Sequence, residues 1–156
     1  MKTAVFVGSF APLHNGHMDV IKRASKVFDK VILAITQNTN KPAIASIADR
    51  EQLLKLACCN ISTVEVKSFS GTLADFCKEN NVDCIIKAVR NTIDFEYEYD
   101  MAVVNKELFG VETLVMFPAP QYRAISSSLV REFLRYDKDI SSLVPTEIEE
   151  KIKEVF

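Results

Sequence analysis

The sequence predicts an α/β protein with a five-stranded, parallel, doubly wound (Rossmann-like) sheet, with helices on both faces and further helices at the C-terminus. Short apolar runs alternate along the chain with longer stretches in which apolar residues recur every three or four positions. Such alternation is typical of parallel sheets, whose neighbouring strands are joined by helical crossovers. No internal repeat, low-complexity tract or linker divides the chain, so residues 1–156 are expected to form one domain.

Each expected strand is a short apolar run, most of them rich in β-branched side chains. The runs are TAVFV at 3–7, VILAI at 31–35, TVEV at 63–66, CII at 84–86 and TLVMF at 113–117. The first helix is expected to open near His17, because Val20, Ile21, Ala24 and Phe28 follow it at helical spacing. The later helices are expected at 47–58, 73–80, 94–109, 127–136 and 145–155.

Composition limits the possible classes of protein. The apolar fraction of 48% and the length of 156 residues are sufficient for a sizeable core, while the apolar runs are far too short to span a bilayer. No secretory signal is recognised, and the net charge of −2 comes without a basic stripe, so neither a membrane nor nucleic acid is an expected partner. The cysteines lack metal-binding spacing and are expected to be reduced thiols of a cytoplasmic protein. They are Cys58, Cys59, Cys77 and Cys84.

The most informative segment is GSFAPLHNGH at 8–17, between the first strand and the first helix. The free N–H groups and the positive dipole end of a helix N-terminus stabilise an anion, and Ser9 adds a hydroxyl donor. The two glycines would let the backbone approach a ligand closely. His17 lies at the loop end of the core-facing stripe, with His14 three residues before it. The alternative is a capping turn with two partly buried, hydrogen-bonded histidines.

Ligands of open α/β sheets bind beyond the carboxyl ends of the strands, where the strand order reverses. The segments that leave these ends carry cations or donors: Ser9, His14 and His17 after the first strand, Lys41 after the second, Lys87 and Arg90 after the fourth, and Arg123 after the fifth. A solvated rim would be expected to mix both signs of charge. This distribution therefore favours a polyanionic ligand, such as a nucleoside triphosphate together with a phosphorylated acceptor.

Two ordered motifs carry a family resemblance. The segment 8–17 resembles the G-T-F-D-P-x-[TH]-x-G-H signature of the nucleotidylyltransferase superfamily, and ISSSLVR at 125–131 resembles its second signature, I-S-S-[ST]-x-[IV]-R. Within that superfamily, KAVRN at 87–91 followed by DFEYE at 94–98 is similar to the R-G-L-R…D-F-E-Y-E segment of the phosphopantetheine adenylyltransferases. The resemblance covers essentially the whole chain.

The resemblance implies transfer of the adenylyl group of ATP to 4′-phosphopantetheine, giving dephospho-coenzyme A and pyrophosphate by in-line attack without a covalent enzyme intermediate. His17, Lys41 and Arg90 would be catalytic, with His17 contacting the transition state. The acceptor would be bound by Ser9, Lys41, Leu73 and Lys87. ATP would be bound by Ser9, Phe10, His17, Ala88, Val89, Arg90, Glu98, Tyr122, Arg123, Ala124, Ile125, Ser126, Ser127 and Ser128.

The acceptor phosphate is already an anion at neutral pH, so no general base is expected. Catalysis would then depend on alignment and on neutralising the charge that builds at the α-phosphoryl group. Mg²⁺ would enter with ATP, because the sequence shows no dedicated carboxylate cage for a metal. The resemblance also implies a homo-oligomer, specifically a hexamer.

Taken alone, several of these residues have ordinary structural interpretations. Lys41 would be a solvent-exposed lysine, Leu73 a core residue of a first helical turn, and Tyr122 a loop aromatic. Glu98 would form an ion pair with a neighbouring basic residue, and the serines at 126–128 would cap a helix.

The chain also departs from the family pattern. Ala11 replaces Asp, His14 replaces the more usual Thr, Lys87 replaces Arg and Ala88 replaces Gly. Histidine at position 14 is common in nicotinate-mononucleotide adenylyltransferases and cytidylyltransferases, so a sister nucleotidylyltransferase is one alternative function. A non-catalytic nucleotide-binding domain is another, although it would not need both His17 and the serine motif.

Overall fold

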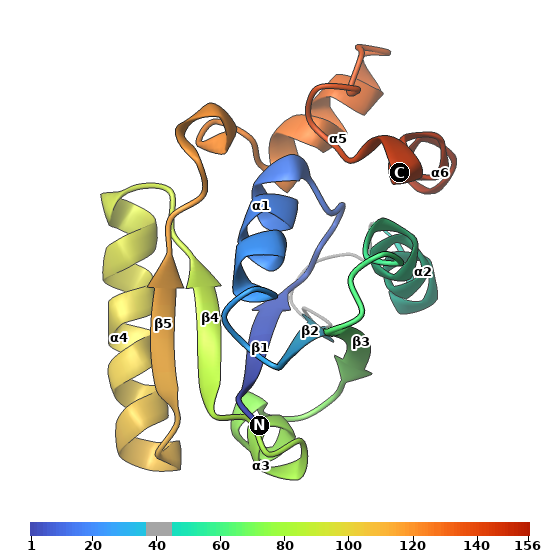
Figure 1. The fold of residues 1–156 in the computed structure, drawn as a ribbon. Coiled ribbons are helices and arrows are strands. Elements are labelled where there is room, and N and C mark those ends of the chain that lie inside the picture. Colours follow the sequence, from blue (N-terminus) through green and yellow to red (C-terminus); the bar gives the residue numbers. More distant parts are fainter. Residues whose placement is uncertain (37–44) are drawn as a thin grey trace.

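The computed structural model describes residues 1–36 and 45–156, and its centre is a five-stranded parallel sheet with the strand order β3-β2-β1-β4-β5. Figure 1 shows β1 in the middle of this sheet. The strands are β1 (Thr3–Gly8), β2 (Lys30–Thr36), β3 (Val64–Phe69), β4 (Cys84–Ala88) and β5 (Glu112–Met116). The predicted fold class, with its five parallel strands, is therefore confirmed.

The edge strand β3 is longer than the sequence predicts. The expected strand ended at residue 66, but Lys67 and Ser68 continue the ladder by pairing with Ala34 and Ile35 of β2. An edge strand accepts polar side chains because one of its long edges faces solvent. Apolar content alone therefore underestimates the length of such a strand.

Within the described residues, the helices lie close to the predicted ranges. They are α1 (Asn15–Ala24), α2 (Ile47–Ala57), α3 (Leu73–Glu79), α4 (Thr92–Phe109), α5 (Ser127–Arg135) and α6 (Glu149–Val155), with 3₁₀ turns η1 (Pro120–Tyr122) and η2 (Thr146–Ile148). The expectation of one helix over 145–155 is wrong in its first part, where Pro145 is extended and η2 precedes α6. Ile148 leaves helical geometry (φ −121°, ψ 1°) while its side chain is fully buried, so core packing overrides the helical periodicity here.

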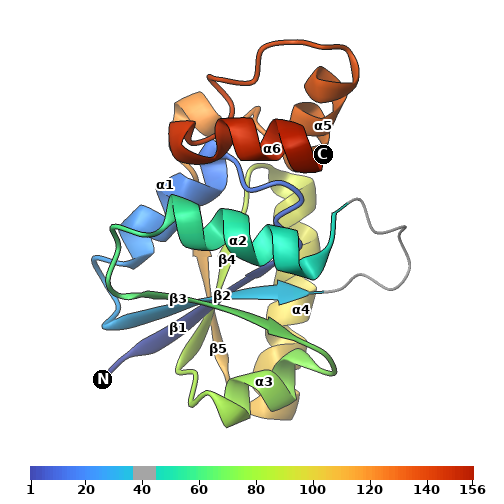
Figure 2. The same cartoon turned by 90° about the vertical axis from the view of Figure 1, so that its right-hand side faces the viewer.

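Helices cover both faces of the sheet, as Figure 2 shows. Leu53 and Leu54 of α2 pack with α1 in the larger core cluster on one face. Phe76 of α3 packs with Val5 of β1 and Ile32 of β2 on the other face. Helix α4 runs alongside β5, and α5 and α6 lie beyond the carboxyl ends of the strands, on the side of α1 and α2 (Figures 1 and 2).

The strand order reverses between β1 and β4. The chain passes from β1 through α1 to β2 on one side, and it returns from β3 through α3 to β4 on the other side of β1. Gly8 and Ala88, the last residues of these adjacent strands, therefore end beside the crevice in which open α/β sheets bind ligands.

All four cysteines are free thiols, as predicted, and only Cys59 among them is exposed. Burial raises the pKa of Cys58 and of Cys77 to about 11, so these thiols stay protonated at neutral pH and are poor nucleophiles. No helix in residues 1–36 or 45–156 combines the length and the apolar character needed to cross a bilayer.

Candidate active site

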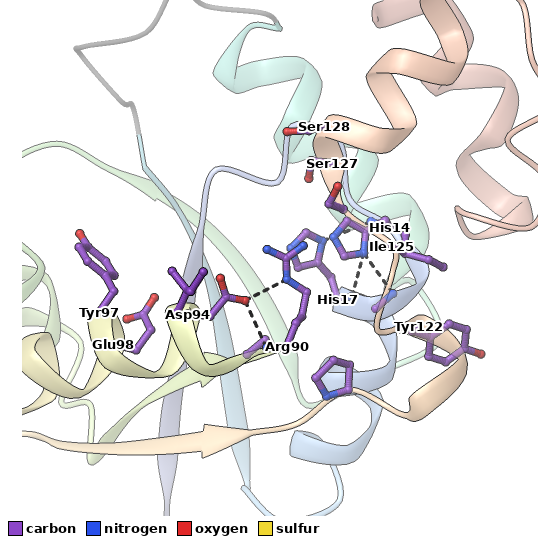
Figure 3. Close-up of a pocket in the computed structure, with 15 residues that line it drawn as sticks. His14, His17, Arg90, Asp94, Tyr97, Glu98, Tyr122, Ile125, Ser127 and Ser128 are labelled. Carbon is purple, nitrogen blue, oxygen red and sulfur yellow. Dashed lines mark hydrogen bonds and ion pairs between the residues drawn. The ribbon is translucent and has the colours of Figure 1, made fainter.

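A cavity of about 560 Å³ opens at the crevice between the ends of β1 and β4, as Figure 3 shows. Its walls come from the start of α1, the segment after β4, the first turns of α4 and the loop that leads into α5. The residues lining it are His14, Gly16, His17, Ala88, Arg90, Ile93, Asp94, Tyr97, Glu98, Pro118, Tyr122, Ile125, Ser126, Ser127 and Ser128. The cavity thus gathers residues from both signature motifs and from the DFEYE segment.

Two histidines form a reciprocal cap at the start of α1. His14 is the N-cap, and its Nδ1 accepts hydrogen bonds from the main-chain N–H groups of Gly16 (3.1 Å) and His17 (3.4 Å). In return, Nδ1 of His17 accepts from the main-chain N–H of His14 (3.3 Å), and the two rings stack with centroids 3.7 Å apart. The capping turn and the candidate anion site are therefore the same structure.

This arrangement fixes the protonation of both rings. Because each Nδ1 accepts a hydrogen bond, we infer that the proton of each neutral ring is on Nε2. Burial and then the nearby Arg90 guanidinium lower the pKa of His14 to about 4. Burial, His14 and Arg90, in that order, hold the pKa of His17 well below its usual value. Both histidines are thus neutral N–H donors at physiological pH.

Arg90 is held in place by the first turn of α4. Its Nε and its main-chain N–H both donate to Oδ2 of Asp94, at 3.1 and 3.2 Å. Asp94 is itself fixed, because its N–H donates to the side chain of the N-cap residue Asn91. In Figure 3 the guanidinium points toward the histidine pair. The structure therefore places a permanent positive charge beside two neutral donors.

Lys87 and Glu98 form an ion pair next to this group. Lys87 Nζ lies 3.0 Å from Glu98 Oε2, and both side chains are about four-fifths buried, at 19% and 18% exposure. This agrees with the structural interpretation of Glu98 as the partner of a basic residue. The same buried oxygen accepts no well-directed hydrogen bond from the described residues, so it keeps acceptor capacity.

The serine motif forms the first turn of α5. Ser126 is the N-cap and accepts from the N–H of Leu129 at 3.1 Å, as the capping interpretation expected. The hydroxyl of Ser127 donates to the carbonyl of Pro12 at 2.8 Å, which ties α5 to the loop after β1. The first N–H groups of a helix lack intrahelical partners, so this turn presents donors to the cavity from the side opposite α4.

The structure brings together most, but not all, of the residues assigned from the sequence. The predicted residues that line the cavity are His17, Ala88, Arg90, Glu98, Tyr122, Ile125, Ser126, Ser127 and Ser128. Ser9, Phe10, Leu73, Lys87, Val89, Arg123 and Ala124 are absent from that lining. Lys41 lies outside the described residues.

The ring of Phe10 packs behind His17, on the side of Phe6. Its side chain is 1% exposed and its ring lies 5.2 Å from that of His17 and 5.6 Å from that of Phe6, edge to face in both cases. A buried ring in this position orients His17 by packing. Ser9, immediately before it, is exposed at the end of β1.

The remaining predicted residues occupy the surroundings of the cavity. Val89 is buried, whereas Arg123 is exposed and its Nε donates to the carbonyl of Arg90 at 3.2 Å. Ala124 is exposed in the loop before α5. Leu73 opens α3 after the end of β3 and packs on the smaller core cluster, as its structural interpretation expected.

The two glycines of the first motif lie against rings of the protein itself. A Cβ at position 16 would meet the His14 ring at 3.0–3.1 Å, and a Cβ at position 8 would meet the Phe10 ring at 3.2–3.4 Å. Both glycines therefore make room for these rings, and the close approach of a ligand stays a prediction. They help to pack the aromatic group around His17.

Sequence reasoning missed several lining residues, including Asp94, Tyr97, Ile93 and Pro118. A signal for Asp94 was present, because it follows Asn91 by three residues, which is the spacing of a helix cap and its first-turn acid. Ile93 and Tyr97 lie one turn apart on α4, but their spacing alone could not show which face of the helix meets the cavity.

Comparison with known proteins identifies relatives along nearly the whole chain. Residues 5–133 match the model of the cytidylyltransferase-like family. A phosphopantetheine adenylyltransferase of Clostridium tetani is 48% identical over 153 residues, which cover 97% of this chain and 96% of the relative. The enzyme of the same name from Frankia alni is 43% identical over 158 residues, covering 99% and 98%.

A solved structure is similar in fold. It is that of a Vibrio parahaemolyticus protein assigned as a nicotinate-nucleotide adenylyltransferase, with a TM-score of 0.73, 19% identity, and coverage of 99% of this chain and 93% of that one. At this identity the match supports the fold alone. The sequence relatives are much closer, and by them the chain belongs to the phosphopantetheine adenylyltransferases of the cytidylyltransferase-like family.

Proposed function

We propose that this protein transfers the adenylyl group of ATP to 4′-phosphopantetheine, producing dephospho-coenzyme A and pyrophosphate. The observation that carries the proposal is the cavity in which His17, Arg90 and the serine turn of α5 converge, in a chain closely related to phosphopantetheine adenylyltransferases. This convergence of donors around one cavity suits a polyphosphate. The reaction is a step of coenzyme A biosynthesis.

The nucleotide occupies the cavity. The N–H groups at the start of α5 face the β- and γ-phosphates, with Ser127 and Ser128 holding the departing pyrophosphate. Arg90 neutralises phosphate charge, since its fork is already oriented by Asp94. The base lies between Tyr122 and the start of α4, where an aromatic ring can stack on a planar base. Glu98 supplies an acceptor at the far end of the cavity.

The acceptor lies on the side of β1 and β4 nearer to α3. Ser9 follows β1, whereas Lys87 lies within β4 as its next-to-last residue rather than after the strand as the sequence predicted. Lys41 belongs to the segment after β2. These residues bind the phosphate of the acceptor, and Leu73 contacts its pantetheine arm. In this arrangement the ion pair of Lys87 with Glu98 links the two substrate sites, because each partner serves one of them.

The chemistry requires positioning rather than proton transfer. The acceptor phosphate is an anion at neutral pH and attacks the α-phosphorus directly, while pyrophosphate leaves on the opposite side. Nε2–H of His17 donates to the α-phosphoryl oxygens as negative charge builds on them, with Lys41 and Arg90 completing the neutralisation. A neutral histidine with one fixed tautomer can donate this hydrogen bond without transferring its proton.

Mg²⁺ is proposed as part of the ATP substrate. In residues 1–36 and 45–156 no group of three or more His, Cys, Asp or Glu is arranged to hold a metal ion. The two carboxylates that line the cavity, Asp94 and Glu98, are paired with Arg90 and Lys87. The ion would therefore be held mainly by phosphate oxygens.

We also propose that the protein is a cytoplasmic homo-oligomer, a hexamer by analogy with the family. Helix α4 supports association. It has 18 residues, all of them described, and only Asn105 is buried. Its exposed surface carries Phe95, Tyr99, Met101, Val103, Val104, Leu108 and Phe109. Exposed apolar patches of this kind mark association surfaces, and Figure 1 shows α4 along the outer side of the molecule.

Pyrophosphate release from ATP tests the proposed reaction. We expect release with 4′-phosphopantetheine, none with pantetheine, which lacks the attacking phosphate, and only background with nicotinate mononucleotide. The arms should be run at equal acceptor concentrations, with dephospho-coenzyme A identified by mass spectrometry. Release with nicotinate mononucleotide and none with phosphopantetheine would overturn the choice of acceptor and leave the nucleotide site standing.

A further inference from the structure

Arg50 is a buried cation that no motif singled out. It is the fourth residue of α2, and only 7% of it is exposed. Its Nη1 donates to the carbonyls of Ser9 at 2.8 Å and Thr36 at 3.1 Å, and its Nε donates to the carbonyl of Ser46 at 3.4 Å. One guanidinium thus joins the residue after β1, the last residue of β2 and the N-cap of α2.

These contacts begin where the ladder between β1 and β2 ends. Its last pair is Gly8 opposite Ile35, so Ser9 and Thr36 lie just past it, although Thr36 still pairs with Phe69 of β3. Beyond this pair no ladder hydrogen bond joins β1 to β2. Arg50 supplies that connection through a single nitrogen.

In residues 1–36 and 45–156, the charge of Arg50 has no acidic partner. Its hydrogen bonds in the described residues all go to carbonyl oxygens, and the segment 37–44 contains neither Asp nor Glu. Burial lowers the pKa of Arg50, which reflects the desolvation of this cation. A buried charge is costly when it lacks a counter-charge. A neutral donor would be sufficient for a purely structural clamp. The charge of Arg50 therefore indicates a functional role at the carboxyl ends of β1 and β2.

The main chain next to Arg50 is strained. Phe10 has φ 46°, in the left-handed region that a bulky residue seldom adopts. Such a conformation is unfavourable and persists only where surrounding contacts impose it. The hydrogen bond from Arg50 fixes the carbonyl of Ser9, which belongs to the peptide plane that enters Phe10. The ring of Phe10 then packs against His17.

We infer that Arg50 is a positioning residue for the reaction: it fixes the Ser9–Phe10 turn, and thereby both the acceptor-binding Ser9 and the ring that orients His17. Its unpaired charge also favours an anion at the exposed end of β1. The inference rests on the proposed function for the roles of Ser9 and His17. It adds a residue from α2 that touches no substrate and acts through the main chain.

The test compares Arg50→Met and Arg50→Lys with a matched control, Arg23→Met. Arg23 of α1 also donates to a main-chain carbonyl beyond a strand, that of Phe117, and it is far more exposed than Arg50. Activity is measured below the melting temperature of each variant. For Arg50→Met we expect kcat/KM for 4′-phosphopantetheine to fall about 100-fold, as for a misplaced catalytic group, while the Kd for ATP changes less than about threefold. Arg23→Met should leave both constants unchanged.

Arg50→Lys keeps the charge but not the fork, so we expect about a tenfold loss of kcat/KM. If Arg50→Met does not fold, this variant decides the question. Wild-type kinetic constants in a folded Arg50→Met or Arg50→Lys, with only a lower melting temperature, would overturn the inference and leave Arg50 a structural clamp.

A readout that does not depend on activity separates this inference from the proposed function. The chain has only two histidines, so selective labelling gives two side-chain NMR signals. We expect the His17 signal to show the Nε2–H tautomer in the wild type and in Arg23→Met, and to shift or broaden in Arg50→Lys. An unchanged His17 signal would overturn the link from Arg50 to His17, even if no acceptor proved to be a substrate.

Discussion

The rings of His14 and His17 hold each other in one orientation in the lining of the candidate active site. The main-chain N–H of each residue donates to Nδ1 of the other, and the rings stack with centroids 3.7 Å apart at 26°. Helix capping, aromatic packing and the choice of tautomer are thus satisfied together. The result is a pair of neutral Nε2–H donors whose direction is fixed before any substrate binds, as electrostatic preorganisation requires.

The first prediction concerns the chemical step. If the contact of His17 tightens only as charge builds at the α-phosphoryl group, His17→Ala should lower kcat by about two to three orders of magnitude with little change in ATP affinity. Steady-state rates beside isothermal titration with ATP measure the two quantities. His14→Thr serves as the comparison, since threonine also caps a helix. A loss of ATP binding equal to the loss of rate would reduce His17 to a ground-state ligand.

The second prediction concerns stability and pH. The pKa of His14 falls to about 4 in the folded protein from an ordinary value of 6.5. Between these pH values the unfolded chain binds a proton that the folded chain does not. The contribution of His14 to the free energy of unfolding is therefore at its maximum above pH 6.5 and decreases as the pH falls toward 4. From pH 7.5 to pH 5, His14 alone should remove about 2 kcal/mol.

Denaturant unfolding at these two pH values, at one protein concentration, measures this loss. His14→Thr should show a loss smaller by about 2 kcal/mol, the share that His14 supplies. The part that remains would include His17, whose pKa is lowered as well. Equal pH dependence in both proteins would contradict the burial of a neutral imidazole at position 14.

The fold could be predicted from the sequence because apolar runs and helical periods alternate without interruption. The site was predicted less completely. The predicted site residues that line the cavity include His17, Arg90 and the serine turn. They lie just after strand ends or in the first turns of helices, and at such positions the sequence indicates which end of the sheet a side chain is near. Phe10 is predicted to bind ATP, but its ring is buried against Phe6 and His17. The carbonyl of the preceding Ser9 accepts a hydrogen bond from Arg50, which is distant in the sequence. Such long-range constraints leave no periodic signal in the sequence.

The third prediction concerns Lys87. In the proposed role, its single point charge would hold a phosphate less rigidly than the forked guanidinium expected from the family resemblance. Lys87→Arg should therefore keep activity intact or lower the KM for phosphopantetheine, with the KM for ATP little affected. Lys87→Gln is the opposite control, since it leaves the buried Glu98 without its ion-pair partner. A large loss of activity in Lys87→Arg would mean that the pocket is shaped around lysine.

The fourth prediction concerns association through α4. Light scattering should give the wild type a mass several times that of the 17.5 kDa chain. Val103→Glu places a charge on the exposed apolar surface of α4, where Val103 is 47% exposed, and should shift the protein to smaller species. Val27→Glu is the matched control, because Val27 is 72% exposed in the turn after α1. A monomeric wild type, or equal effects of both substitutions, would contradict the role of α4.

The last prediction separates the two roles of Asp94. Asp94, Asp49 and Asp75 each lie three residues after the N-cap of a helix, in α4, α2 and α3, and the N–H of each donates to the cap side chain. Replacing any of them with alanine should cost a similar, small amount of stability, about 0.5 kcal/mol, because each loses a favourable interaction with the helix dipole. Only Asp94 also holds Arg90.

Asp94→Ala should therefore lower kcat/KM for ATP by about tenfold or more, since the guanidinium of Arg90 loses its fixed orientation. Asp49→Ala and Asp75→Ala should match it in melting temperature and retain wild-type kinetics. Both kcat/KM and the melting temperature need to be measured on all three variants, because the difference between them carries the argument. If Asp94→Ala keeps full activity, Arg90 does not need its partner, and the ion pair is a feature of the helix start alone.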